Sequence, residues 1–208
     1  MSRPIAVLRP EPGNRATAAA IEGRGRRAIR LPLFEVRPLP WTAPDPGDFD
    51  ALILTSANAV RHAGAELATL AALPVHAVGK ATAEAARRAG LHVVSIGDDG
   101  AAGLVAEAEA AGVRRALHLA GRERTLVAGG IVAAIVTVYA SEPLPLPSDS
   151  VARLAGSVAL VQSTRAAHRL AELVGATERS SIALVAVSAR AATAAGLGWE
   201  QVQVAADP

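Results

Sequence analysis

The chain has 208 residues and a formal net charge of +2, and it contains no cysteine. The absence of cysteine excludes disulfides, thiolate catalysis and cysteine-based zinc sites. No apolar stretch approaches the ~20 residues that cross a membrane. Of the 21 basic residues all but Lys80 are arginine, a bias that a GC-rich genome explains and that also suits carboxylate and phosphate binding. The cluster Arg24-Gly25-Arg26-Arg27 has no aromatic neighbour, so no nucleic-acid partner is expected. Met1-Ser2-Arg3-Pro4 runs directly into a strand-like segment without a signal-peptide pattern, and we expect a cytoplasmic protein.

The first elements predict a β-α-β unit. Ile5–Leu8 has the composition of a buried parallel strand, and Asn14 is expected to cap a helix over about Arg15–Arg26. A second strand is expected at Ile29–Val36. The following residues, Arg37 to Gly47, are rich in proline and predict a linker.

Strands and helices then alternate over about one hundred residues. Strands are expected at Ala51–Leu54, Val75–Val78, His92–Ile96, Ala116–Leu119 and Ala133–Tyr139. Such alternation is typical of a parallel sheet with helices on both faces. A second proline-rich stretch, Ser141–Pro147, closes this region, and the remaining chain ends in a strand at Val202–Ala205.

One strand–helix–strand–helix segment occurs twice. Ala51–Leu54 and Thr55-Ser56 correspond to Val158–Val161 and Gln162-Ser163, and each copy continues into a second strand and an alanine-rich helix. The repeat predicts an α/β fold with two similar parallel-sheet lobes joined by a two-stranded linker, with a ligand bound between the lobes. Because the proline stretches bracket one copy, the lobes are expected to comprise residues 1–37 plus 142–208 and residues 38–141.

Hydroxyl-bearing or small residues follow four of the expected strands. Helix N-termini at such positions offer free N–H groups to anions, and ligands of parallel sheets bind beyond the carboxyl ends of the strands. The alternative is that the serine and threonine side chains only cap their helices. The four segments are Thr55-Ser56, Gly79-Lys80-Ala81-Thr82, Ser163-Thr164 and Ser188.

Common catalytic and cofactor motifs are absent. No Gly-x-Gly-x-x-Gly follows a strand, there is no P-loop, and the five histidines lack metal-ligand spacing, so neither a cofactor nor a metal is expected. His62 and His168 occupy nearly matching positions of the repeat and are interpreted as residues of solvated helix faces. Tyr139 ends the strand that enters the second linker, where it either faces the ligand or packs at the hinge.

Several stretches, in order, resemble the uroporphyrinogen-III synthase family. They are Val7-Leu8-Arg9-Pro10, Leu52–Val60, Ala77–Ala83, Leu119-Ala120-Gly121-Arg122, Val136-Thr137-Val138-Tyr139 and the strand end at Ser163. The turn at Ser188-Ala189-Arg190 departs from the family pattern by losing hydroxyls, and the chain ends at Asp207-Pro208, where relatives continue into a final helix.

The resemblance implies an enzyme that cyclises hydroxymethylbilane to uroporphyrinogen III, inverting ring D and losing water, without a cofactor. Tyr139 is the expected catalytic side chain, and the protein is expected to be a monomer. The alternative is a two-lobed cytoplasmic small-molecule-binding or sensor domain without catalysis. The substrate carries eight carboxylates, and the expected substrate-binding residues are Arg9, Thr55, Ser56, Asn58, Gly79, Lys80, Thr82, Gly121, Ser163, Thr164, Ser188 and Arg190.

Overall fold

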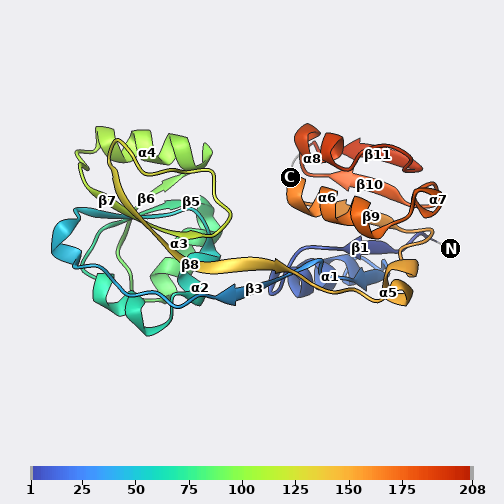
Figure 1. Ribbon diagram of the computed structural model, residues 1–208, viewed down its shortest axis with the longest axis horizontal. Helices are drawn as coiled ribbons and strands as arrows, with labels where there is room; N and C mark the ends of the chain where they lie inside the picture. The colour runs from blue at the N-terminus through green and yellow to red at the C-terminus, as the bar shows by residue number, and fades with distance from the viewer. Residues whose placement is uncertain (1, 207–208) are drawn as a thin grey trace. The chain divides into compact units, whose positions relative to one another are not determined.

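Segments from both ends of the chain form one five-stranded parallel sheet in the computed structural model, which describes residues 2–206 (Figure 1). The strand order is β11-β10-β9-β1-β2. The strands are β1 (Ile5–Val7), β2 (Ala28–Arg30), β9 (Val158–Val161), β10 (Ala183–Ala186) and β11 (Gln201–Val204). The accompanying helices are α1 (Gly13–Glu22), α5 (Ser148–Ala152), α6 (Thr164–Leu173), α7 (Ala176–Arg179) and α8 (Ala189–Ala194).

Alanine lets the helices of this sheet pack closely. α6 lies against α8, and the buried residues of the two helices include Ala166, Ala167 and Ala191. The larger side chains of the core come from β10 and from the segments around it, among them Leu184, Leu170 and Trp199. Because alanine loses no side-chain entropy on burial, an alanine-rich interface is stabilised with little conformational cost.

The middle of the chain forms a second sheet of six strands. Its order is β3-β8-β7-β4-β5-β6. The strands are β3 (Phe34–Pro38), β4 (Ala51–Leu54), β5 (Val75–Val78), β6 (Val93–Gly97), β7 (Ala116–Gly121) and β8 (Val132–Pro143). The helices are α2 (Ala57–His62), α3 (Gly79–Arg88) and α4 (Gly100–Ala110), with 3-10 helices at Pro46–Asp48 and Gly64–Leu70.

Both faces of the second sheet are covered, which explains the uninterrupted apolar run of β4. Leu52 and Leu54 belong to the core beneath α2 and α3, whereas Ala51 and Ile53 belong to the core beneath α4. Figure 1 shows α4 on the opposite side of this sheet from α2 and α3. All four residues of β4 are fully buried, as expected for a central parallel strand.

The chain divides into two units, which we call unit 1 (residues up to 35 and from 142 onward) and unit 2 (residues 36–141). The first boundary lies two residues before the expected one. Phe34 packs in the core of unit 1, and the strand that Phe34 begins, β3, pairs with β8 in the sheet of unit 2. The chain therefore passes between the units along two paired strands.

Three local predictions were wrong. Ile29–Val36 is not one strand, because it splits into β2 of unit 1 and the start of β3. The second proline-rich stretch does not end the preceding strand, since β8 continues to Pro143. Asn14 does not cap α1; it lies inside the helix, where its buried Nδ2 donates to the carbonyls of Val7 (2.7 Å) and Arg9 (3.0 Å). Asp207 and Pro208 lie outside the described residues.

The five parallel strands of the two units correspond one to one. The order in unit 1 is β11-β10-β9-β1-β2, and the parallel strands of unit 2 follow in the order β6-β5-β4-β7-β8. When the two orders are aligned, β9 corresponds to β4 and β1 corresponds to β7. Unit 1 is thus a circular permutation of unit 2, because the strands that come last in unit 2 come first in unit 1. This permutation explains why the repeated segment is flanked differently in its two copies.

Candidate functional site

Each sheet has one place where the order of its strands reverses. In unit 2 the chain runs outward from β4 to β6 and then returns to β7 on the other side of β4. In unit 1 the corresponding place lies between β1 and β9. Parallel sheets bind ligands beyond the carboxyl ends of the strands at such points. The residues that follow β4, β7, β1 and β9 therefore form the candidate site of each unit.

At the reversal point of unit 2, a hydroxyl meets a buried histidine. Thr55 directly follows β4 and is half-buried, and its Oγ1 lies 3.1 Å from Nε2 of His118 on β7. His118 is completely buried. Burial, and secondly the charge of Arg124, lower the pKa of His118 to about 4, so its imidazole is neutral at physiological pH.

A guanidinium lies beside this pair. Nη1 of Arg124 is within hydrogen-bonding distance of the carbonyls of Gly121 (3.1 Å) and Arg122 (3.2 Å) and of Oγ1 of Thr137 (3.2 Å). These contacts fix a positive charge at the carboxyl end of β7. An anion bound there gains charge-assisted hydrogen bonds.

Tyr139 lies over Gly121 at the same edge of the sheet. A Cβ atom added to Gly121 would meet Cζ of the tyrosine ring at 2.6 Å and the phenol oxygen at 2.8 Å. The imidazole of His62, at the end of α2, lies near the phenol ring, with 6.2 Å between ring centroids. Burial, and secondly Arg61, lower the pKa of His62. The absence of a side chain at Gly121 thus creates the place that the phenol occupies.

All three predicted serines are helix caps. The hydroxyl oxygens of Ser56, Ser163 and Ser188 accept hydrogen bonds from the backbone N–H groups of Asn58 (3.2 Å), Ala166 (3.1 Å) and Ala191 (3.2 Å). These three side chains therefore cap their helices, as the alternative interpretation expected of them. Each hydroxyl still has its own hydrogen to donate to a ligand.

The remaining predicted residues of unit 2 differ in accessibility. Gly79 has φ +73°, a conformation that favours glycine, and Lys80 is exposed in the first turn of α3. Asn58 is half-buried and accepts a hydrogen bond from Arg61 at 3.2 Å. Thr82 is only 5% exposed, so its side chain does not offer a surface to a ligand in this conformation.

In unit 1 the sheet edge carries guanidinium groups. Arg9 is exposed after β1, and its guanidinium folds over Gly13, where an added Cβ would lie 2.5 Å from Nε. Arg190 is exposed in the first turn of α8, and Thr164, the first residue of α6, is half-buried. Because β1, β9 and β10 are adjacent and parallel, the residues that follow them share one edge of the sheet.

Sequence reasoning missed two histidines. His62 was interpreted as part of a solvated helix face, but it is half-buried beside Tyr139; its counterpart His168 is exposed. His118 stands in an apolar strand, and only the pairing of β4 with β7 brings it to Thr55. A polar residue inside an otherwise apolar strand was the available signal, because a buried polar group requires a partner.

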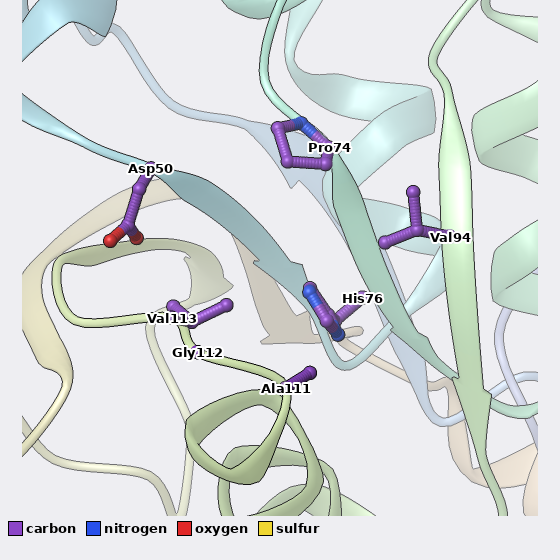
Figure 2. A pocket seen from close by; sticks show the side chains of 7 residues that line it. All are labelled: Asp50, Pro74, His76, Val94, Ala111, Gly112 and Val113. Carbon is purple, nitrogen blue, oxygen red and sulfur yellow. The ribbon is translucent and has the colours of Figure 1, made fainter.

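A hollow of about 400 Å³ lies at the opposite edge of the unit 2 sheet (Figure 2). It is lined by Asp50, Pro74, His76, Val94, Ala111, Gly112 and Val113, several of which precede β4, β5 and β7. Burial lowers the pKa of His76, and the carboxylates of Glu107 and Asp50 oppose that shift. Carboxylates at this edge do not favour an anionic ligand, and none of the predicted binding residues lies there.

The described residues contain neither a membrane-spanning helix nor a cluster of metal-ligating side chains. Within residues 2–206 no helix is long and apolar enough to cross a membrane. Nor does that part of the chain contain a group of three or more histidine, aspartate or glutamate side chains placed to hold a metal ion.

Comparison with known proteins identifies the family. The structure of this chain is similar to the uroporphyrinogen-III synthase of Helicobacter pylori, with a TM-score of 0.67 and 18% sequence identity. It is also similar to a triple mutant of the uroporphyrinogen-III synthase of Thermus thermophilus, with a TM-score of 0.57 and 18% sequence identity. The first alignment covers 100% of this chain and 94% of the other, and the second covers 97% and 92%. No curated protein sequence matches. Residues 15–208 match the family described as Uroporphyrinogen-III synthase HemD, and the chain therefore belongs to this family of cyclising lyases of tetrapyrrole biosynthesis.

Proposed function

We propose that this chain closes the linear tetrapyrrole hydroxymethylbilane into uroporphyrinogen III, with inversion of ring D and loss of water. Membership of the family supports the reaction, and one local observation supports the site. Tyr139 lies over Gly121 at the carboxyl edge of the unit 2 sheet, beside His62 and close to the reversal point of the strands.

Binding the substrate requires distributed anion contacts, because it carries eight carboxylates. We assign these contacts to the carboxyl edges of both sheets. In unit 1 the contacts come from Arg9, Arg190 and the N-terminus of the capped helix α6. In unit 2 they come from the loop after β4 and from the start of α3. Guanidinium groups bind carboxylates through paired charge-assisted hydrogen bonds, and helix N-termini add N–H donors.

The chemistry itself needs little acid assistance. Departure of the hydroxyl leaves a cationic azafulvene that the pyrrole nitrogen stabilises. Selectivity is the harder task, because uncatalysed closure gives the isomer without inversion. Holding the chain so that the substituted carbon of ring D is attacked is catalysis by orientation. In this scheme the phenol of Tyr139 donates a hydrogen bond to the departing hydroxyl.

The reaction is tested with freshly generated hydroxymethylbilane, followed by oxidation and separation of the porphyrin isomers. We expect the type III isomer to form in proportion to the amount of protein added. Formation of the type I isomer alone, at the uncatalysed rate, would show that the chain only binds small molecules.

Tyr139→Phe tests the role of the phenol. General acid assistance contributes about 10²–10⁴-fold, and a single hydrogen bond belongs at or below the lower end of that range. We therefore expect a loss in kcat of up to about a hundredfold with KM nearly unchanged. Unchanged turnover and isomer yield in Tyr139→Phe would make Tyr139 a packing residue.

We further propose that the protein acts as a cytoplasmic monomer. The small formal net charge of +2 and the absence of cysteine in the sequence are compatible with this proposal. Light scattering coupled to gel filtration measures the mass directly, and a mass of about twice 21.1 kDa would exclude the monomer.

A further inference from the structure

The contact between Thr55 and His118 is a specific feature of unit 2. In unit 1 the strand register places Val7 opposite Leu160, just as it places His118 opposite Ile53 in unit 2. The position equivalent to Thr55 is Gln162, which is exposed. Because the same sheet is built in unit 1 with valine in place of the histidine, the fold itself does not require a buried imidazole.

Only one nitrogen of the His118 ring has a partner among the described residues. Nε2 lies 3.1 Å from Oγ1 of Thr55, while Nδ1 is buried without a hydrogen bond. A neutral imidazole carries one hydrogen, on one of these two nitrogens. Burying an unpaired N–H donor is rarer in proteins than burying an under-used acceptor. The hydrogen therefore belongs on Nε2, and Nδ1 keeps only a lone pair.

We propose that His118 is a positioning residue that sets the polarity of the Thr55 hydroxyl, by donating its Nε2–H to Oγ1. With Oγ1 accepting from His118, the hydroxyl hydrogen of Thr55 is free to point outward from the half-buried site. Thr55 is then a hydrogen-bond donor toward the ligand. Arg124, held at the same sheet edge by Gly121 and Thr137, adds a positive charge beside it.

The partner that fits this arrangement is a carboxylate of the substrate. Carboxylates are acceptors only, and a hydroxyl that gave its hydrogen to His118 would present lone pairs to them instead. This inference rests on the proposed function of the same sheet edge and deepens it. Thr55 also differs from Ser56, Ser163 and Ser188, whose oxygens accept from backbone N–H groups rather than from a side chain.

The protonation pattern of the ring is measured without substrate. Protein labelled with ¹⁵N-histidine gives long-range nitrogen–proton correlations that distinguish the two neutral tautomers, and the signals of His118 are those lost in His118→Gln. We expect the tautomer protonated on Nε2. The tautomer protonated on Nδ1, or a charged ring at pH 7, would overturn the proposal.

A kinetic cycle then tests the coupling of the two side chains. We expect His118→Leu and Thr55→Val each to lower kcat/KM for hydroxymethylbilane by about fivefold, the effect of one hydrogen bond. Because both changes remove the same interaction, the double variant is expected to be no worse than either single one. Additive losses would overturn the proposal.

Two further variants separate positioning from folding. His76→Leu removes another buried imidazole whose Nδ1 lacks a partner, at the opposite edge of the same sheet, and is expected to leave kcat/KM unchanged. His118→Gln retains an amide N–H that can reach Oγ1, and it is expected to restore most of the activity lost in His118→Leu. A loss in His118→Gln as large as that in His118→Leu would contradict the proposal. If the parent protein does not turn over hydroxymethylbilane, the proposed function fails, and the tautomer measurement still decides the hydrogen bond.

Discussion

Acidification is expected to destabilise unit 2 through His118. Burial, and secondly Arg124, lower the pKa of this imidazole from 6.5 to about 4 in the folded protein, whereas in the unfolded chain the ring titrates near its ordinary value. Below pH 6.5 the unfolded state therefore binds a proton that the folded state does not. The free energy of unfolding falls as the pH decreases, until the folded ring is also protonated near pH 4.

The size of the effect follows from the difference between the two pKa values. The pKa of His118 is lowered from 6.5 to about 4, and each pKa unit corresponds to about 1.4 kcal/mol of free energy. His118 is fully buried, so little of this is screened by solvent, and the loss between pH 7 and pH 4 is roughly 3 kcal/mol. Domains are stable by about 5–15 kcal/mol, so a single protonation removes a large share of the stability.

The two tryptophans allow unit 2 to be followed by itself. Trp41 packs against the core of unit 2, where its Nε1 donates to the carbonyl of Ala63 at 2.8 Å, and Trp199 belongs to the core of unit 1. In a Trp199→Phe background the fluorescence of Trp41 reports urea unfolding of unit 2 at each pH.

Comparison with a variant isolates the contribution of His118. His118→Gln, in the same background, lacks the titrating ring and is expected to lose about 3 kcal/mol less than the parent between pH 7 and pH 4. His62 and His76, whose pKa values are also lowered, titrate in both proteins and cancel in the difference. Equal losses in parent and variant would refute the argument.

Three further substitutions test the site. Gly121→Ala places a Cβ 2.6 Å from Cζ of Tyr139 and must displace the ring, so kcat is expected to fall by on the order of tenfold or more while the urea midpoint changes little; an unchanged kcat would show that the ring position is unimportant. Ser56→Ala removes a cap, and we expect about 1 kcal/mol of lost stability and about a fivefold lower kcat/KM; complete inactivity of a folded variant would instead indicate a catalytic serine. Arg9→Ala is expected to raise KM several-fold with kcat unchanged, because binding contacts act equally on ground and transition states; a lowered kcat alone would contradict this.

The sequence predicted the sheets well, because parallel strands are continuous apolar runs bounded by turn residues. Ala51–Leu54 and Val158–Val161 were placed at the residues where β4 and β9 lie. The two errors in strand bounds occurred where the chain passes from one unit to the other. Ile29–Val36 has the composition of a single strand, and only tertiary packing shows that its two halves join different sheets.

The candidate site was less accessible to sequence reasoning, because its contacts join residues far apart in the chain. Serines after strands could be recognised as caps or anion ligands, and the structure shows that Ser56, Ser163 and Ser188 cap their helices. The pairing of Thr55 with His118 depends on β7 lying next to β4, an order that no local pattern specifies. In the same way, the burial of Thr82 depends on which face of α3 packs against the sheet.

The two reversal points are built from different chemistry, and the proposed reaction explains the difference. The edge of unit 1 presents the guanidiniums of Arg9 and Arg190 together with capped helices, which suit carboxylates. The edge of unit 2 carries the guanidinium of Arg124, and beside it lie two neutral groups, the phenol of Tyr139 over Gly121 and the imidazole of His118 next to Thr55. A substrate with many carboxylates requires charge for binding. The departure of one hydroxyl requires in addition a positioned hydrogen-bond donor, and in the proposed scheme the neutral phenol of Tyr139 supplies it. On the proposed function, two sheets of the same strand arrangement therefore meet two requirements, charged groups for binding the carboxylates and a positioned donor for the departure of the hydroxyl.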